Sequence, residues 1–322
     1  MVLPKFDYYS PTSLADALKY LADNQGKGVK VLAGGTDLLV DLRAKVIPDH
    51  HRARCQQHHG TNVRIEINKP DPVHVLMGMS RIEGMRGISQ KGSKIRIGAM
   101  TTITDLERSE LIRDLLPSLW DGACSLGSPL VRNRGTLGGN ICNARPAADT
   151  AIPALAHSAK LVLANSRGAR IVDHNDFVTG PGRTIIKPDE ILTAIVFEVP
   201  ENSSGAYYKL ANRKALEISV VGAAASIAFN EDGIVTSARI ALGAVAPKPL
   251  LVTDAAAELV GKKLTSELIA SAAHIAEEIA KPITDHRGTK DYRSAMVEVL
   301  VRRVIVKSKE RFEAKAVQEV VA

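Results

Sequence analysis

The fold of this chain is decided by a glycine-rich stretch that reads Pro129-Leu130-Val131-Arg132-Asn133-Arg134-Gly135-Thr136-Leu137-Gly138-Gly139-Asn140. Glycine tolerates positive φ angles, and its missing Cβ lets the main chain approach a ligand closely. Consecutive backbone N–H groups in such a turn form a concave nest that favours an anion. Because Thr136 and Asn140 add a hydroxyl and an amide, the stretch predicts a loop that holds a phosphate-bearing ligand.

A second glycine turn lies upstream, at Ala33-Gly34-Gly35-Thr36-Asp37-Leu38. It follows a short apolar strand predicted at 29–33 and precedes a helical pattern at 38–43. The order strand, glycine turn, helix is typical of a phosphate-binding turn. The turn lacks the glycine and lysine pattern of a P-loop and the spaced glycines of a Rossmann fingerprint. A plain tight turn is therefore the alternative for this segment taken alone.

Composition and charge exclude several classes of function. The 322-residue chain is 45% hydrophobic and 24% charged, which is ordinary for a soluble globular protein, and its length suits two or three domains. Aromatic residues make up only 4%, which argues against a stacking platform for single-stranded nucleic acid. The net charge of +7 comes from scattered basic residues, except for a run near the C-terminus. That run contains Arg302, Arg303, Lys307, Lys309 and Arg311. We interpret it as a solvated helix face, with an acidic partner as the alternative, and predict no nucleic-acid partner.

The three cysteines, Cys55, Cys124 and Cys142, lie far apart and form no C-x-x-C pair. A disulfide framework or a zinc module is therefore not expected, and reduced thiols of a cytoplasmic protein are the simplest interpretation. Residues 1–9 lack the apolar region of a signal peptide. No apolar run reaches the roughly 18 residues of a membrane span. We predict a cytoplasmic protein without a membrane span.

Histidines crowd the segment 48–74, which is polar and basic. They are His50, His51, His58, His59 and His74, with Cys55 among them. Histidine and cysteine together suggest a metal site, but adjacent pairs do not place ligands on one helix face. An exposed insertion is the better interpretation, and we predict no metal site in this chain.

Periodicity divides the chain at the polar stretch 201–205. Before it, strands are predicted at 29–33, 75–77, 94–99, 160–164, 169–172 and 194–199, and helices at 14–21, 38–43, 104–109 and 115–124. After it, strands are predicted at 207–210, 219–229 and 234–242, and helices at 254–260, 265–279 and 292–312. The second half is therefore an α+β unit, an antiparallel sheet with helices on one face. The two predicted domains span 1–200 and 206–315.

The inventory of catalytic side chains is sparse. The chain contains no nucleophile elbow, no zinc-protease motif and no kinase signature. Asp149 precedes an apolar helical run at 152–159 and is either a helix N-cap or a carboxylate that accepts hydrogen bonds from a ligand. Two separated glycine loops suit a long ligand with a central pyrophosphate, such as a dinucleotide. In such a protein the cofactor carries the chemistry, so we expect no catalytic residue beyond the cofactor.

At this point the motifs, taken in order, resemble a known family. They are Val31–Leu38, Arg132–Asn140, Pro146-Ala147-Ala148-Asp149, Asp176-Phe177, Gly180-Pro181-Gly182-Arg183-Thr184, Tyr208–Arg213, Gly243–Pro247 and Tyr292-Arg293. The set resembles the FAD-binding (medium) subunit of molybdenum hydroxylases, the family of xanthine dehydrogenase, carbon monoxide dehydrogenase and 4-hydroxybenzoyl-CoA reductase. Each motif alone is weak, but their order over almost the whole chain is specific.

The resemblance implies a fold and a set of site residues. Residues 1–200 would form the two-part FAD fold of vanillyl-alcohol-oxidase (PCMH) type, with subdomains near 1–60 and 61–200. The C-terminal α+β domain of these subunits would follow. The implied cofactor-binding residues are Val31, Leu32, Ala33, Gly34, Gly35, Thr36, Asp37, Leu38, Thr136, Gly138, Gly139, Asn140, Asp149, Ile191, Leu192 and Lys209. Lys209 would lie near the flavin and stabilise its anionic reduced form, so Lys209→Ala should lower the flavin midpoint potential.

The resemblance also implies partners. A large subunit would hold a molybdenum-pterin cofactor, a small subunit would hold two [2Fe-2S] clusters, and the assembly would be a dimer of heterotrimers. FAD in this chain would exchange electrons with an external carrier. The [4Fe-4S] cluster of the 4-hydroxybenzoyl-CoA reductase branch is not predicted, because the short segment from Asn140 to Asp149 holds Cys142 alone. The alternatives are a stand-alone FAD-dependent oxidoreductase and an assembly subunit that has lost FAD.

Overall fold

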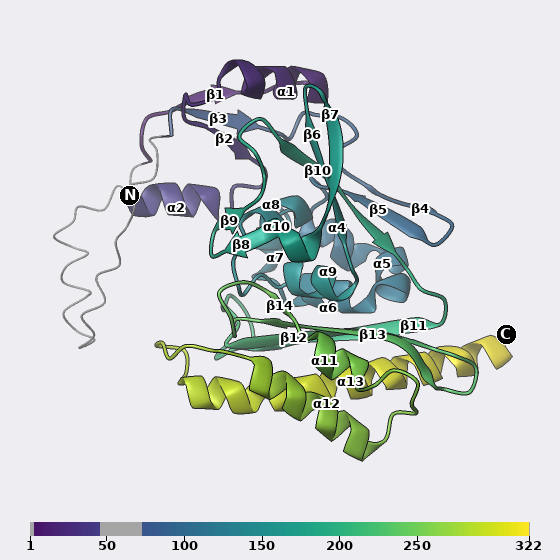
Figure 1. The fold of residues 1–322 in the computed structure, drawn as a ribbon. Coiled ribbons are helices and arrows are strands. Elements are labelled where there is room, and N and C mark those ends of the chain that lie inside the picture. The colour runs from purple at the N-terminus through teal and green to yellow at the C-terminus, as the bar shows by residue number, and fades with distance from the viewer. Residues whose placement is uncertain (1–2, 46–72, 322) are drawn as a thin grey trace.

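The computed structural model describes residues 3–45 and 73–321, arranged in three layers of sheet and helix (Figure 1). A small parallel sheet lies at one end, a five-stranded antiparallel sheet with several short helices lies in the middle, and a four-stranded antiparallel sheet backed by long helices lies at the other end. Apart from residues 73 and 74, the histidine-rich insertion predicted at 48–74 lies outside the described residues. None of the described helices is long and apolar enough to cross a membrane.

The small sheet has the order β1-β3-β2, and all its strands are parallel. The strands are β1 (Asp7–Tyr9), β2 (Val29–Leu32) and β3 (Val75–Gly78), and the helices are α1 (Leu14–Asp23) and α2 (Leu38–Lys45). Ser13 caps α1 by accepting a hydrogen bond from the Asp16 amide, as serine commonly does at a helix N-terminus. Because β3 pairs with both other strands, this sheet extends beyond residue 60, where the first subdomain was predicted to end.

The five-stranded sheet has the order β4-β5-β10-β6-β7. Its strands are β4 (Ile88–Lys91), β5 (Lys94–Gly98), β6 (Lys160–Asn165), β7 (Gly168–Asp173) and β10 (Ile191–Glu198). The accompanying elements are α4 (Ile103–Arg108), α5 (Glu110–Leu115), α6 (Pro117–Ser125), α7 (Pro129–Arg132), α8 (Leu137–Cys142), α9 (Ala151–Ala156), α10 (His174–Phe177), β8 (Val178–Gly180) and β9 (Arg183–Thr184). The strands predicted at 160–164 and 169–172 are confirmed as β6 and β7, which pair as a hairpin. Phe177 and Phe197 are fully buried in the hydrophobic core.

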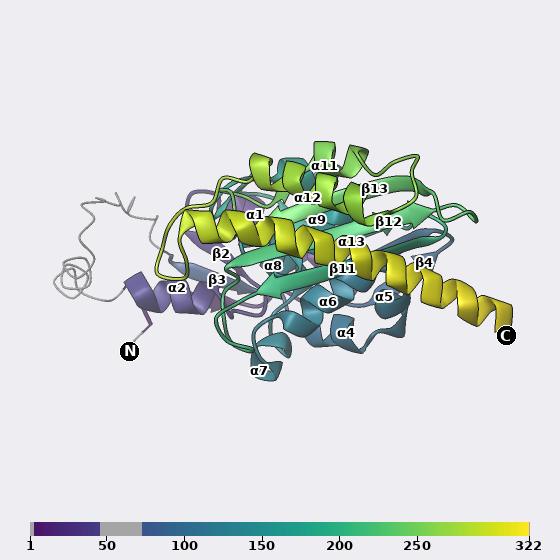
Figure 2. The same cartoon turned by 90° about the horizontal axis from the view of Figure 1, so that it is seen from below.

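The C-terminal domain confirms the predicted antiparallel sheet with helices on one face (Figures 1 and 2). Its strands are β11 (Ser203–Leu210), β12 (Val221–Phe229), β13 (Val235–Gly243) and β14 (Leu250–Leu251), and its helices are α11 (Thr253–Ala257), α12 (Ser266–Ile279) and α13 (Lys290–Val321). Every residue of β12 is buried, because the helices α11–α13 cover one face while α6 and α9 pack against the other. A Cβ on Gly222 would lie 3.1 Å from the Ile152 side chain, so small residues on β12 permit this close packing.

An ion pair joins the C-terminal helix to the middle layer. The Arg311 guanidinium donates to both oxygens of Asp121, at 2.7 and 2.8 Å, and also to the Gly205 carbonyl oxygen. Asp121 accepts in addition from the Tyr207 amide at 3.0 Å. The interpretation of Arg311 as part of a solvated helix face is therefore wrong. Its guanidinium makes a bidentate pair with a carboxylate of another element, and the periodicity of α13 alone does not reveal that partner.

Two histidines are buried in the middle layer. The His157 Nε2 atom lies 2.7 Å from the Ser118 hydroxyl, and burial lowers the pKa of His157 to about 3. Burial likewise lowers the pKa of His174 to about 4. Both imidazoles are therefore neutral in the folded chain at pH values where they would be protonated in the unfolded chain.

This burial predicts a stability that falls in mild acid. Below pH 6.5 the unfolded chain binds protons at these positions and the folded chain does not, so the free energy of unfolding should fall by about 1.4 kcal/mol per histidine for each pH unit. The fall should continue until the pH approaches the lowered pKa values. Urea unfolding of the wild type and of His157→Gln at pH 7, 6 and 5 measures the effect. The variant should lose one histidine's share of the slope; an unchanged slope would show that His157 is not buried as a neutral group.

Candidate cofactor site

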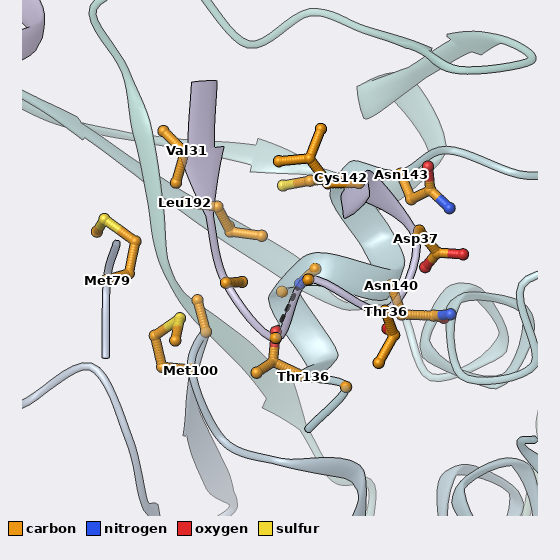
Figure 3. Close-up of a pocket in the computed structure, with 18 of the residues that line it drawn as sticks. Val31, Thr36, Asp37, Met79, Met100, Thr136, Asn140, Cys142, Asn143 and Leu192 are labelled. Atoms are coloured by element: carbon orange, nitrogen blue, oxygen red, sulfur yellow. Dashed lines mark hydrogen bonds between the residues drawn. The ribbon is translucent and has the colours of Figure 1, made fainter. Parts of the chain in front are cut away.

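A cavity of about 640 Å³ lies between the β2–α2 loop, α8 and the start of β10 (Figure 3). Most of the site residues predicted from the sequence line it. These are Val31, Ala33, Gly34, Gly35, Thr36, Asp37, Leu38, Thr136, Gly138, Gly139, Asn140, Asp149, Ile191 and Leu192. Leu32 and Lys209 lie outside the lining. The volume falls within the range of about 300–1,000 Å³ that cofactor and small-molecule sites have.

The upstream glycine turn presents free amides to the cavity. Within the described residues, the backbone N–H groups of 33–37 donate to no acceptor. Gly35 has a φ of +77°, a conformation that glycine adopts without strain. The carbonyl oxygens of Gly35 and Asp37 accept from Leu39 and Asp41 and so begin α2. This turn has the free donors of an anion nest next to a helix N-terminus.

The downstream glycine stretch is built differently. Gly138 donates its amide to the Ala99 carbonyl oxygen at 2.9 Å, and Gly139 donates to the Thr136 hydroxyl at 3.0 Å. The amides of Leu137 and Asn140 are also bonded within the protein. The expectation of an anion nest here is therefore wrong, because Thr136 caps α8 and the amides of its first turn are already satisfied.

Space, rather than positive φ, explains the glycines of this stretch. A Cβ on Gly138 would lie 2.7 Å from both the Cβ and the carbonyl oxygen of Ala99. A Cβ on Gly34 would overlap the carbonyl oxygen of Arg134 and lie 2.5 Å from its carbonyl carbon. The two glycine segments therefore meet backbone to backbone at Gly34, and this contact closes one side of the cavity.

Asn140 and Asp149 retain limited capacity for a ligand. The side-chain oxygen of Asn140 accepts from the Thr150 hydroxyl at 2.7 Å, and its side-chain nitrogen has no acceptor in the described part of the chain. The Asp149 carboxylate accepts from Lys209 Nζ, Tyr207 Oη and Ser219 Oγ, at 2.7, 2.8 and 2.9 Å. Since an ionised carboxylate offers about four acceptor positions, one position on Asp149 is left.

Asp149 is not the cap of α9. Thr150 is the N-cap residue and makes no side-chain capping bond, so the N-cap interpretation is wrong. Asp149 is 7% exposed. Burial raises its pKa, while Lys209 and the hydroxyls of Tyr207 and Ser219 oppose the rise. Its three donors all come from the C-terminal domain, about 60 to 70 residues away in sequence, so Asp149 joins the two domains beside the cavity.

Lys209 faces a different space. Its ammonium pairs with Asp149 and also donates to the Ser125 carbonyl oxygen at 3.3 Å. It lines a smaller polar pocket of about 300 Å³ together with Asn212 and Arg213. The positive charge of Lys209 is therefore balanced by Asp149 rather than offered to the main cavity.

Sequence reasoning missed several residues of the lining. Met79, Met85 and Met100 form an apolar wall, and Figure 3 places Met79 and Met100 on the side away from Asp37 and Asn140. Leu216, Glu217 and Ile218 reach the cavity from the C-terminal domain, and Ile186 to Pro188 line it just before β10. The sequence motif closest to residues 186–188 is the glycine-containing motif at 180–184, which does not itself line the cavity.

Family models match both halves of the chain. Residues 59–201 match the FAD binding domain in molybdopterin dehydrogenase, and residues 206–308 match the CO dehydrogenase flavoprotein C-terminal domain. The xanthine dehydrogenase FAD-binding subunit of Escherichia coli O157:H7 is 32% identical over 301 residues, covering 92% of this chain and 94% of that protein. The chain belongs to the FAD-binding subunits of the xanthine and carbon monoxide dehydrogenase family. It is thus a flavoprotein component of the oxidoreductase class.

Other members of the family agree in sequence and in structure. The carbon monoxide dehydrogenase medium chain of Hydrogenophaga pseudoflava is 31% identical over 306 residues, covering 95% of this chain and 97% of that one. Its solved structure superimposes with a TM-score of 0.84 over 97% of this chain and 99% of that one. A chain of quinoline 2-oxidoreductase from Pseudomonas putida 86 has a TM-score of 0.82 and 27% identity, with 96% and 99% covered. The similarity to members of the family therefore extends over nearly the full length of this chain.

Proposed function

We propose that this chain is the FAD-bearing electron-transfer subunit of a molybdenum hydroxylase complex. It passes electrons between [2Fe-2S] clusters of a partner subunit and an external acceptor or donor. The observation that carries the proposal is the cavity, which joins a turn of free amides to an apolar wall. Such a site suits a dinucleotide with an anionic centre and an aromatic ring.

The residues present fit FAD. The free backbone amides of 33–37 would hold the pyrophosphate. The side-chain nitrogen of Asn140 and the remaining acceptor position of Asp149 would hold polar groups of the cofactor. Ile191 and Leu192, both buried at the start of β10, would pack against the ring. FAD supplies one- and two-electron redox chemistry when bound, while this chain binds and orients it.

Most of the carboxylates of the site support a carrier role. Asp41, Asp149, Glu190 and Glu217 each pair with a cation of this chain, and Asp37 is the carboxylate of the described lining outside these pairs. A carboxylate that is held in an ion pair is poorly suited to take a proton from a substrate. We infer that oxidation of the organic or gaseous substrate takes place on another subunit. The two-part FAD fold of vanillyl-alcohol-oxidase type is part of this proposal.

The proposed partners follow from the relatives. Carbon monoxide dehydrogenase and quinoline 2-oxidoreductase supply the solved structures with the same fold. We propose a large molybdenum-pterin subunit, a small subunit with two [2Fe-2S] clusters, and a cytoplasmic dimer of heterotrimers. This chain would contribute FAD and no iron–sulfur cluster.

Purification of the native complex tests the proposal. We expect three co-purifying chains, a flavin absorbance band near ~450 nm and molybdenum, iron and FAD in the preparation. A yellow protein that purifies alone and turns over a substrate would instead support a stand-alone FAD oxidoreductase. A colourless chain that binds its partners but no FAD would support an assembly subunit.

A further inference from the structure

The charges that line the cavity are unevenly neutralised. Among the described residues, five carboxylates line it, from Asp37, Asp41, Asp149, Glu190 and Glu217. All but Asp37 pair with cations that lie outside the lining, namely Arg145, Lys209, Arg170 and Arg213. In the part of the chain that the structure describes, Lys30 and Lys187 are the cationic side chains of the lining itself. Neither ammonium group makes a hydrogen bond or an ion pair with any described residue, so both are available to an anionic ligand.

Lys187 belongs to a turn that an ion pair between the partly exposed Arg170 and the buried Glu190 holds in place. Glu190, whose side chain is 2% exposed, accepts from Arg170 Nε at 2.7 Å and from Arg170 Nη2 at 2.9 Å. The same carboxylate accepts from the Lys187 amide at 2.8 Å, and Arg170 also donates to the Ile185 carbonyl oxygen at 3.0 Å. Bidentate pairs of this kind fix both distance and orientation, so the segment that carries Lys187 is anchored at both ends.

A neighbouring ion pair on the same hairpin provides a contrast. Arg167, at the tip between β6 and β7, donates to Asp189 at 3.1 Å, and its side chain is 77% exposed. Asp189 does not line the cavity and does not bond to Lys187. The chain therefore holds two arginine–carboxylate pairs between the same hairpin and the same turn, and only one of them fixes the segment beside the cavity.

We propose that Lys187 is a cofactor-binding cation and that Arg170, acting through Glu190, is its positioning residue. The ligand group is an anion of the dinucleotide, either the pyrophosphate or the reduced flavin ring. This inference rests on the proposed FAD site and adds to it a residue that no glycine motif indicates. Lys187 takes the role of free cation that sequence reasoning gave to Lys209, whose charge Asp149 already balances.

Titration of FAD into the full chain stripped of flavin tests the proposal, with Lys187→Met, Arg170→Met and the matched control Arg167→Met. The Lys187 and Arg170 variants should bind FAD about tenfold more weakly, as loss of one charge-assisted contact predicts. Raising the salt concentration should weaken wild-type binding more than binding by Lys187→Met, because screening acts on the free charge. Lys187→Arg should recover most of the affinity, and Arg167→Met should bind as the wild type does.

The double variant Lys187→Met/Arg170→Met separates positioning from general stability. If Arg170 acts through Lys187, the double variant binds FAD no more weakly than Lys187→Met alone. Additive losses would overturn the positioning role. ADP binding distinguishes the two ligand groups: a matching loss with ADP assigns Lys187 to the pyrophosphate, and a lowered flavin midpoint potential with unchanged ADP binding assigns it to the ring.

Two failures remain distinguishable. If the wild-type chain binds no FAD, the proposed function fails. If the wild type binds FAD and Lys187→Met binds it equally tightly with the same dependence on salt, only the role of Lys187 is overturned.

Discussion

Gly34→Ala is expected to weaken FAD binding by roughly a hundredfold, the upper end of what a forced shift of about 1–3 kcal/mol produces. The added methyl group would overlap the carbonyl oxygen of Arg134. Both atoms belong to or attach directly to the main chain, so no side-chain rotation relieves the overlap. The two glycine segments must separate, and the free amides of 33–37 must move away from the ligand.

The matched control for Gly34 is Gly180→Ala. Gly180 lies in the motif at 180–184, where a Cβ would meet no atom within 4 Å and the φ angle is not positive. Equilibrium titration with FAD and thermal unfolding of both variants give the comparison. Gly180→Ala should behave as the wild type does. Retention of full FAD affinity by Gly34→Ala would show that the contact with Arg134 does not shape the site.

Lys209→Met is expected to lower the free energy of unfolding by about 3–5 kcal/mol, the usual cost of removing one partner of a buried ion pair. The side chains of Lys209 and Asp149 are both 9% exposed, so the remaining carboxylate has little access to water. Asp149→Asn in the same chain should restore most of the loss, because the amide is uncharged and its oxygen still accepts from Tyr207 and Ser219.

Urea unfolding of the two single variants and of the double variant measures this coupling. Lys262→Met is the control, since its pair with Glu258 lies at the surface, with side chains 50% and 32% exposed, and should contribute about 0.5 kcal/mol. The idea fails if Lys209→Met costs no more than this control. The flavin midpoint potential should also fall in Lys209→Met, as was expected for Lys209→Ala from the family resemblance. The reason differs: the Asp149 charge, no longer balanced by Lys209, would then line the cavity.

Local patterns predicted the regular elements well. The helix predicted at 14–21 corresponds to α1, and the strand predicted at 94–99 corresponds to β5. The strands predicted at 219–229 and 234–242 correspond to β12 and β13, which pair as a hairpin. These signals lie within the element that they predict, so no tertiary contact is needed to read them.

The errors arose where a distant partner decides the role of a residue. The amides of Leu137 and Gly138 at the start of α8 are occupied because Thr101 and Ala99 lie beside them, and the glycine stretch alone does not reveal these neighbours. Asp149 is held by donors from the other domain, so its local position before a helix was misleading. Lys187 was missed because it lies between motifs, and only Glu190 and Arg170 bring it to the cavity.

The cofactor motifs themselves were legible because they encode backbone geometry. Position 34 has no room for a Cβ, and position 35 has a positive φ. Both requirements favour glycine, so they can be recognised in the sequence. A side chain that lines a cavity through packing alone, such as Met79 or Met100, leaves no comparable mark. The sequence therefore predicted the glycine turns of the site but missed part of its apolar lining.

The seam between the two domains sets a rule for recombining this family. Asp149 depends on Tyr207, Lys209 and Ser219, and Asp121 depends on Arg311. A hybrid subunit that takes its C-terminal half from a relative would inherit only one side of each charge pair. Exchanges of this half should yield a folded hybrid only where the donor relative supplies matching partners for Asp121 and Asp149. These contacts, more than the sequence identity between the two parent proteins, should decide which hybrids fold.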